Sequence, residues 1–170
     1  MVVADVRGLD PQGDPRNVGV NGVGDLLVSA QVYRSPTIRV PGIGAAAAYV
    51  SGDAFGAGFS FSVPVVGTIA HVYFLDYDDE GIQKDLVLFS LPFVATADNS
   101  AFAVSDADLR NCVGVAVINT YRNFGNNQFG EAGPALNYVA PQGTLYAQLV
   151  TRGADNIAAG ASPEIYLVIV

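Results

Sequence analysis

AFGAGFSFSVPVVGTIAHVYFL, residues 54–75, is the stretch that decides the fold of this 170-residue chain. It has no charged residue and is long enough to cross a bilayer as a helix. However, it contains three glycines and Pro64, and in FSFSVPV (residues 59–65) apolar and polar side chains alternate. Alternation with a period of two is typical of a half-buried strand, so the stretch predicts two strands and a turn. Because proline cannot donate to a strand ladder, we expect the first strand at a sheet edge.

Further segments along the chain predict strands, which brings the expected number to about eight. They are LLVSAQVYR (26–34), AAAAYV (45–50), DLVLFSLPF (85–93), VGVAVINTY (113–121), TLYAQLV (144–150) and EIYLVIV (164–170). Strands at this spacing without amphipathic helices predict an all-β antiparallel sandwich, and eight strands suit a jelly roll. IAHVYFLD (69–76) and residues 85–93 are apolar on both faces, which indicates central strands, and residues 164–170 should form a paired inner strand.

Two segments differ from this pattern. Residues 1–24 are rich in proline and glycine and have no usable periodicity, so we expect an extended N-terminal arm and a single β-sandwich domain over residues 25–170. ADNSAFAVSDAD (97–108) interrupts two apolar runs. We interpret it either as a long crossover linker at one end of the sandwich, where small residues permit packing against another subunit, or as an ordinary surface loop. Within it, SDADLR predicts one helical turn capped by Ser105.

Charged residues make up only 14% of the chain, against roughly 25% in an ordinary soluble domain. Such a surface favours association, and we expect neighbouring subunits to cover part of it. Seven of the eight basic residues are arginine, which is enriched in protein interfaces. The net charge of −8 and a pI near 4.3 argue against nucleic acid and anionic membranes as partners.

The residues that chemistry would need are sparse, and we expect neither an enzyme nor a bound cofactor. His71 is the only histidine and Cys112 the only cysteine, and both lie in or beside apolar runs where a structural role is expected. In DYDDEG (76–81), the spacing of Asp76, Asp78 and Glu80 resembles the start of a calcium loop, but the twelfth position is Val87 and not an acid. A hairpin tip between two central strands explains these acids equally well.

Several segments together resemble a known group of proteins. YVSGDAFG (49–56), LFSLPF (88–93), ADNSAF (97–102), SDADLRNCVGVAVI (105–118) and TLYAQLVTRG (144–153) are similar to small structural proteins of tailed bacteriophages. This resemblance implies a virion protein of the capsid decoration, or cement, type: a β-rich homotrimer that binds the major capsid protein on the outer capsid surface. The residues we expect to bind partners are in the arm and among the first arginines: Val2, Val3, Val6, Arg7, Arg16, Arg34 and Arg39.

Two other functions stay open at the sequence level. One is a tail, baseplate or receptor-binding component of a virion. The other is a carbohydrate-binding or hydrolytic β-sandwich, because two carboxylates from different strands could form a glycosidase pair. The chain has no tryptophan, and most of its tyrosines and phenylalanines occupy strand positions that a core would bury, which disfavours a sugar site.

Overall fold

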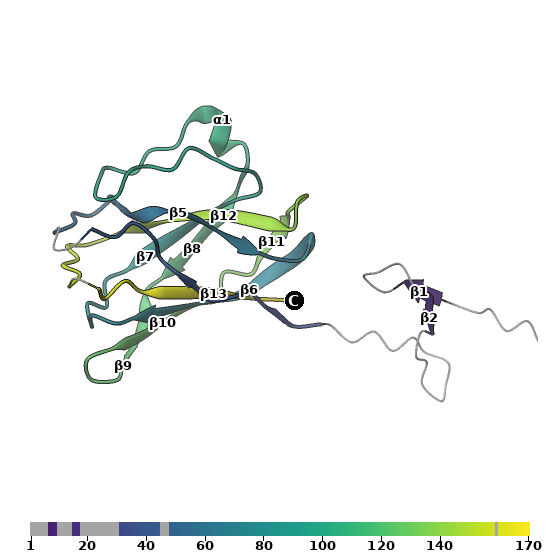
Figure 1. The fold of residues 1–170 in the computed structure, drawn as a ribbon, viewed down its shortest axis with the longest axis horizontal. Helices are drawn as coiled ribbons and strands as arrows, with labels where there is room; N and C mark the ends of the chain where they lie inside the picture. Colours follow the sequence, from purple (N-terminus) through teal and green to yellow (C-terminus); the bar gives the residue numbers. More distant parts are fainter. Residues whose placement is uncertain (1–6, 10–14, 18–30, 45–47, 159) are drawn as a thin grey trace, which may run out of the picture. The chain divides into compact units, whose positions relative to one another are not determined.

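In this computed structural model, the described residues are 7–9, 15–17, 31–44, 48–158 and 160–170. The chain forms two units, residues 1–31 and residues 32–170. In the first unit, strands β1 (Arg7–Leu9) and β2 (Pro15–Asn17) pair antiparallel (Figure 1), where we expected no regular structure. Arg7 and Arg16 lie on these two strands. Val2, Val3, Val6 and the predicted boundary at Gly24 lie outside the described residues.

All regular elements of the second unit that the structure describes are strands, except one short helix. Its elements are β3 (Tyr33–Arg34), β4 (Ile38–Arg39), β5 (Ala54–Ser62), β6 (Val66–Asp76), β7 (Lys84–Phe89), α1 (Asp106–Leu109), β8 (Cys112–Ile118), β9 (Thr120–Asn123), β10 (Gln128–Ala132), β11 (Leu136–Val139), β12 (Thr144–Thr151) and β13 (Glu164–Ile169). They form two antiparallel sheets. The seven-stranded sheet has the order β3–β13–β6–β10–β9, with β4 also beside β13 and β11 also beside β6, and the four-stranded sheet has the order β5–β12–β7–β8.

The pairing of these strands is that of a jelly roll. Three pairs of short strands each act as one interrupted strand: β3 with β4 along β13, β10 with β11 along β6, and β8 with β9, which only Asn119 separates. Counting each pair once leaves eight strands, in which the first pairs with the eighth, the second with the seventh, the third with the sixth and the fourth with the fifth. One long hairpin rolled into two sheets gives this nested order. The predicted all-β jelly roll is confirmed.

Alternation along the strands fills the space between the sheets. On β13, Ile165 and Leu167 are fully buried and belong to the main core, while Glu164 and Tyr166 between them are only half-buried on the outer side. The strand β7 is buried on both faces, as predicted, because Leu86 and its inward neighbours join the main core while the outward residues enter a second apolar cluster. Both predicted central strands, β6 and β7, have neighbours on each side.

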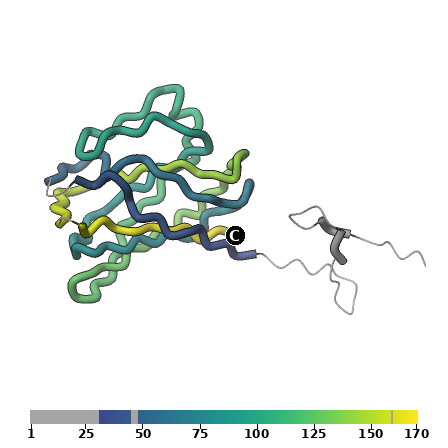
Figure 2. The backbone as a smooth tube through the Cα atoms, viewed as in Figure 1, coloured from purple at the N-terminus to yellow at the C-terminus, as the bar shows by residue number. Residues whose placement is uncertain are grey.

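The second cluster exists because residues 90–111 cover part of the outer face of the four-stranded sheet, while Val115 and Val117 on the outer side of β8 stay exposed. Phe93 and Phe102 of this segment pack against Val87, Phe89 and Val150 of the sheet, and the segment with α1 lies over β5 and β12 in Figures 1 and 2. The sequence placed it at one end of the sandwich, which is wrong. The predicted helical turn is present as α1, with the Ser105 hydroxyl accepting a hydrogen bond from the Asp108 amide at 3.1 Å.

Two polar side chains, the buried Gln148 and the half-buried Asp98, fasten this covering segment, residues 90–111, to the body. Gln148 of β12 is fully buried; its Oε1 accepts from the Thr96 amide at 2.9 Å, and its Nε2 donates to the carbonyls of Thr96 and Gly56. The carboxylate of Asp98 accepts from the Tyr49 hydroxyl at 2.8 Å and from the Gly56 amide at 2.7 Å. The small residues of ADNSAFAVSDAD therefore pack against their own sheet.

Other details of the prediction are corrected by the structure. The strand β5 lies at a sheet edge as predicted, but it ends at Ser62, before the proline. Residues 48–50 are not a strand, and 45–47 lie outside the described residues. Of LLVSAQVYR, only Tyr33–Arg34 is a described strand. DYDDEG is not a hairpin tip, because β6 and β7 belong to different sheets and this turn passes from one sheet to the other. Among the described residues, no helix has the length and apolar character needed to cross a membrane.

Candidate functional site

No segment among the described residues covers the outer face of the seven-stranded sheet, whereas residues 90–111 cover part of the outer face of the four-stranded sheet. The strand register aligns outward side chains in rows across it. One row runs over five strands, and its members are Arg39, Glu164, Leu75, Phe129 and Arg122. The next row contains Tyr166, Tyr73, Glu131 and Thr120, and the third contains Arg34, Val168 and His71. We call these twelve residues the open face.

Aromatic rings form the centre of the open face. The ring of Tyr73 lies 5.1 Å from that of Tyr166, 5.2 Å from that of Phe129 and 5.7 Å from that of His71, measured between ring centres. These distances are those of favourable aromatic pairs. His71 is exposed and the other three are half-buried, so the rings offer a continuous apolar surface to a partner. Three neighbouring strands, β13, β6 and β10, supply them, and the paired backbone holds them rigidly.

Arginines occupy both borders of the open face. Arg34 and Arg39 lie on the β3 and β4 border and Arg122 on the β9 border, while Glu131 and Glu164 lie between them. The Arg34 guanidinium sits 4.0 Å from the centre of the Tyr166 ring, a cation–π contact that fixes the side chain over the aromatic centre. The Tyr77 hydroxyl donates to Glu164 at 3.1 Å, and burial together with this bond raises the pKa of Tyr77.

The acidic turn at residues 76–81 uses its carboxylates to hold its own backbone. Asp76 is buried, and its two oxygens accept hydrogen bonds from the amides of Asp78 and Gly81 at 3.0 and 3.1 Å. Asp78 in turn accepts from the amide of Ala158. Burial raises the pKa of Glu80, with the nearby Asp155 as a second cause. Within the described ranges, no group of three or more acidic, histidine or cysteine side chains is placed to hold a metal ion.

The single histidine and the single cysteine are not partners. His71 is in the middle of β6 and points outward on the open face, where it stacks on Tyr73. Cys112 begins β8 in the other sheet and is half-buried against the second apolar cluster. The two side chains therefore belong to different sheets of the sandwich, and the fold does not bring them together as a nucleophile and base.

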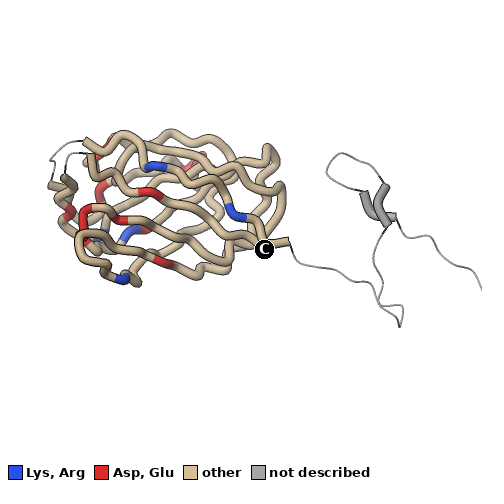
Figure 3. The backbone as a smooth tube through the Cα atoms, turned by 60° about the horizontal axis from the view of Figure 1, so that its bottom comes forward, with Lys and Arg blue, Asp and Glu red and all other residues tan. Residues whose placement is uncertain are grey.

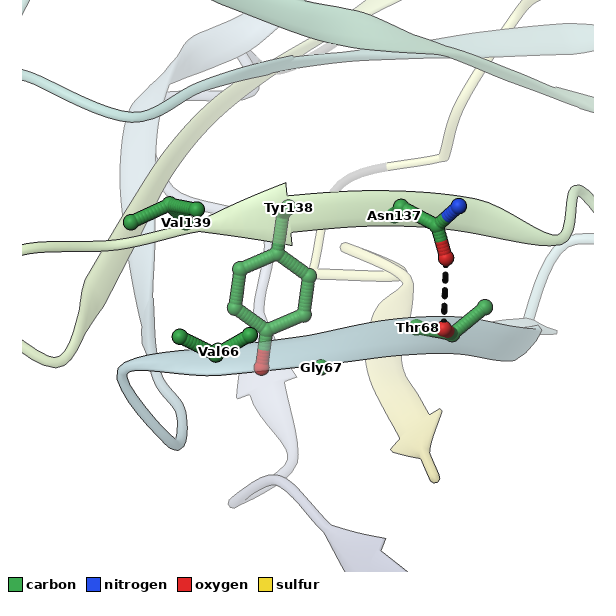
Figure 4. A pocket seen from close by; sticks show the side chains of 6 residues that line it. All are labelled: Val66, Gly67, Thr68, Asn137, Tyr138 and Val139. Atoms are coloured by element: carbon green, nitrogen blue, oxygen red, sulfur yellow. Dashed lines mark hydrogen bonds between the residues drawn. The ribbon is translucent and has the colours of Figure 1, made fainter.

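Two pockets lie away from the open face. The first, of about 400 Å³, lies between β6 and β11 (Figure 4) and is lined by Val66, Gly67, Thr68, Asn137, Tyr138 and Val139. Its Thr68 hydroxyl donates to Asn137 at 2.6 Å, and the Tyr138 hydroxyl faces Gly67. The second, of about 350 Å³, lies where the covering segment meets β5 and β12, beside Phe59, Phe93 and Tyr146. Both are mainly apolar and shallow.

Comparison of the chain with protein-family models, with curated proteins and with solved structures finds no match. The open face therefore has to be interpreted from its own geometry.

The structure unites some of the predicted partner-binding residues and adds others. Arg34 on β3 and Arg39 on β4 both lie beside the same edge of β13, at the border of the open face. The aromatic residues Tyr73, Phe129 and Tyr166 were missed, because the sequence pattern assigned tyrosines and phenylalanines in strands to the core. A sequence pattern that marks the outward positions is present in EIYLVI (164–169). There Ile165, Leu167 and Ile169 are more apolar than the residues that alternate with them. That alternation indicates which residues face outward but not whether another segment covers them.

Proposed function

We propose that the chain is a virion structural protein, a capsid decoration or cement protein that binds the outside of a phage shell as a homo-oligomer and stabilises it. The observation on which this proposal depends is the asymmetry of the sandwich. Residues 90–111 cover much of the outer face of one sheet, whereas the other sheet presents the aromatic centre and arginine borders of the open face. Interface cores are enriched in aromatic residues and arginine and depleted in lysine.

The charge distribution supports the same proposal. The only lysine of the chain is buried, so the positive charge on the described surface of the sandwich comes from arginine, with His71 as the one exposed histidine. Charged segments are sparse along the backbone in Figure 3, where most of the tube is uncharged. A net charge of −8 suits the exterior of a shell whose interior holds DNA, since an acidic protein is repelled by nucleic acid. Repeated moderate contacts in a symmetric array bind strongly through avidity.

The fold is compatible with this role without establishing it. Jelly rolls occur in viral capsid proteins and in lectins, and a fold shared by several functions does not define one. The resemblance of residues 49–170 to small phage structural proteins favours the virion among these alternatives. The contact would run through the open face, with the N-terminal arm as a second contact to a neighbouring subunit.

A pair of matched variants tests the proposal. His71→Glu places an acid at the exposed position beside Tyr73, while Val94→Glu places one on the covering segment, where the side chain is 79% exposed. Both add one negative charge and leave the core untouched. We expect the wild type and Val94→Glu to sediment as homo-oligomers and to bind empty capsid shells, and His71→Glu to do neither. A wild type that sediments as a monomer and does not bind shells would contradict the proposal. Equal sedimentation and equal shell binding of the two variants would contradict it as well.

A carbohydrate-binding sandwich is the second candidate, because the rings of Tyr73, Tyr166 and Phe129 form a surface on which sugar rings could stack. A glycan array separates the candidates: specific glycan binding that Tyr73→Ala abolishes, in a protein without shell affinity, would favour this function. A tail or receptor-binding position on the virion is distinguished from the capsid position by electron microscopy of labelled particles.

A further inference from the structure

Lys84 occupies a position where lysine is rare. It is the first residue of β7, and the alternation of that strand directs its side chain to the same inner face as Leu86 and Leu88. Lys84 is 1% exposed, and its Nζ lies 4.9 Å from the centre of the Phe55 ring and 5.9 Å from that of Phe74. Placing an ammonium group among core aromatics is costly unless a specific partner compensates for the lost hydration.

Asp155 is that partner. It follows β12 in the chain and is 0% exposed. Its Oδ1 lies 2.7 Å from the Nζ of Lys84, and its Oδ2 accepts a hydrogen bond from the Thr151 hydroxyl. Thr151 is directly opposite Lys84 in the ladder between β12 and β7, so the three side chains converge from two paired strands and the segment after them. The Nζ also donates to the Ile82 carbonyl at 2.8 Å, which fixes the amine against the carboxyl group.

Burial favours the uncharged form of both members of the pair. It lowers the pKa of Lys84 and raises the pKa of Asp155, although the attraction between the two opposes both shifts. The carboxyls of Asp76 and Glu80 oppose this effect on Lys84, because negative charge nearby favours the charged amine and raises its pKa. The Thr151 hydrogen bond likewise lowers the pKa of Asp155. The net directions bring the pKa values of the two groups closer together, so burial shifts the pair from the ion pair toward a neutral amine beside a neutral acid.

We propose that Lys84 and Asp155 join through an intramolecular amide (isopeptide) bond. A neutral lysine amine is a nucleophile, and a protonated carboxyl carbon is an electrophile that a carboxylate is not. The fold already holds the two groups in contact, so the reaction does not have to pay the entropy cost of bringing them together, which is a large part of its activation barrier. This covalent site is independent of the open face and of any partner.

The reaction needs no other reactant. The nitrogen of Lys84 attacks Cγ of Asp155, a carbon–nitrogen bond forms, and one carbon–oxygen bond of the carboxyl group breaks. The departing oxygen keeps its own proton, takes one from the amine and leaves as water. Because Thr151 binds Oδ2 and the amine contacts Oδ1, the carboxyl group is held with its carbon next to the nucleophile. The product is an uncharged amide, which removes two buried charges from the core.

The bond would link distant parts of the chain. Lys84 starts β7 of the four-stranded sheet, while Asp155 lies in the connection from β12 to β13, which crosses to the seven-stranded sheet. The link would close the chain between residues 84 and 155 and fasten the connection between the sheets at the end of the sandwich that carries the acidic turn. Such a covalent cross-link suits a protein that must stay folded for a long time without being replaced by newly made copies.

Mass spectrometry of the full-length protein tests the proposal directly. We expect the denatured wild type to be lighter than its sequence by one water molecule, and Lys84→Met and Asp155→Ala to have the full mass of their sequences. Asp155→Asn should react with loss of ammonia and give a product of the same mass as the wild type. Because Lys84 is the only lysine, trypsin should leave residues 40–110 uncut and joined to residues 153–170.

An opposite result is equally clear and does not depend on whether a variant folds. A wild type at its full sequence mass, with residues 40–84, 85–110 and 153–170 recovered as separate linear tryptic peptides, would show an ion pair only and overturn the proposal. Loss of water that maps to another pair of residues would overturn it as well.

Discussion

Gln148 provides the sharpest test of how the covering segment, residues 90–111, is held on the sandwich. Its buried side chain makes three hydrogen bonds, at 2.9 Å from the Thr96 amide, 2.6 Å to the Thr96 carbonyl and 2.9 Å to the Gly56 carbonyl. Gln148→Leu keeps the size of the side chain and removes all three. At about 1 kcal/mol for each hydrogen bond, we expect the free energy of unfolding to fall by about 3 kcal/mol.

Urea denaturation measures this loss, and hydrogen exchange locates it. The Thr96 amide should lose its protection in Gln148→Leu, because its acceptor is gone, while amides in the middle of β13 should be less affected. Gln142→Leu is the matched control, since that glutamine is exposed in the turn before β12. A loss below about 0.5 kcal/mol, with the Thr96 amide still protected, would refute the claim that Gln148 fastens the segment.

Three further predictions concern the first pocket, its buried tyrosine and the N-terminal unit. Burial raises the pKa of Tyr138 to about 12, so the folded state holds the hydroxyl proton more tightly than the unfolded chain. The free energy of unfolding should therefore decline between about pH 10 and pH 12. Urea titrations at alkaline pH should show a smaller decline for Tyr138→Phe, and an unchanged decline would contradict this prediction. Gly67→Ala should cost about 1–3 kcal/mol in thermal or urea unfolding, because the new Cβ would lie 2.6 Å from a methyl carbon of Ile169; an unchanged midpoint would contradict the close packing. Deletion of residues 1–24 should leave the circular dichroism and melting of the sandwich unchanged but weaken assembly, whereas an unfolded product would place the arm in the core.

The fold was predictable where a local pattern determined it. Residues 59–65 alternate, residues 165–170 are an uninterrupted run of apolar and aromatic residues, and Ser105 precedes two helix-favouring aspartates; each pattern gave the expected type of element. The partners of the strands were not predictable in the same way, because a jelly roll pairs residues far apart in the chain. The turn at residues 76–81 therefore looked like a hairpin tip although its two strands belong to different sheets.

The candidate sites were harder to predict, because each depends on what lies above or beside a strand. Tyr73 and Phe89 are both aromatic residues in apolar strands, yet Tyr73 is on the uncovered sheet and Phe89 lies beneath residues 90–111. No local pattern marks Lys84 as a buried residue. Its burial follows from Asp155, which is 71 positions away in the chain and adjacent only after β7 and β12 have paired.

The central claim, that the open face is a contact surface of a capsid decoration protein, is tested most directly by a cryo-electron microscopy reconstruction of capsid shells incubated with the chain. We expect jelly-roll density on the outside of the shell, with the seven-stranded sheet turned toward a neighbouring protein. Bare shells, or bound density with Tyr73 and Tyr166 facing solvent, would contradict the claim.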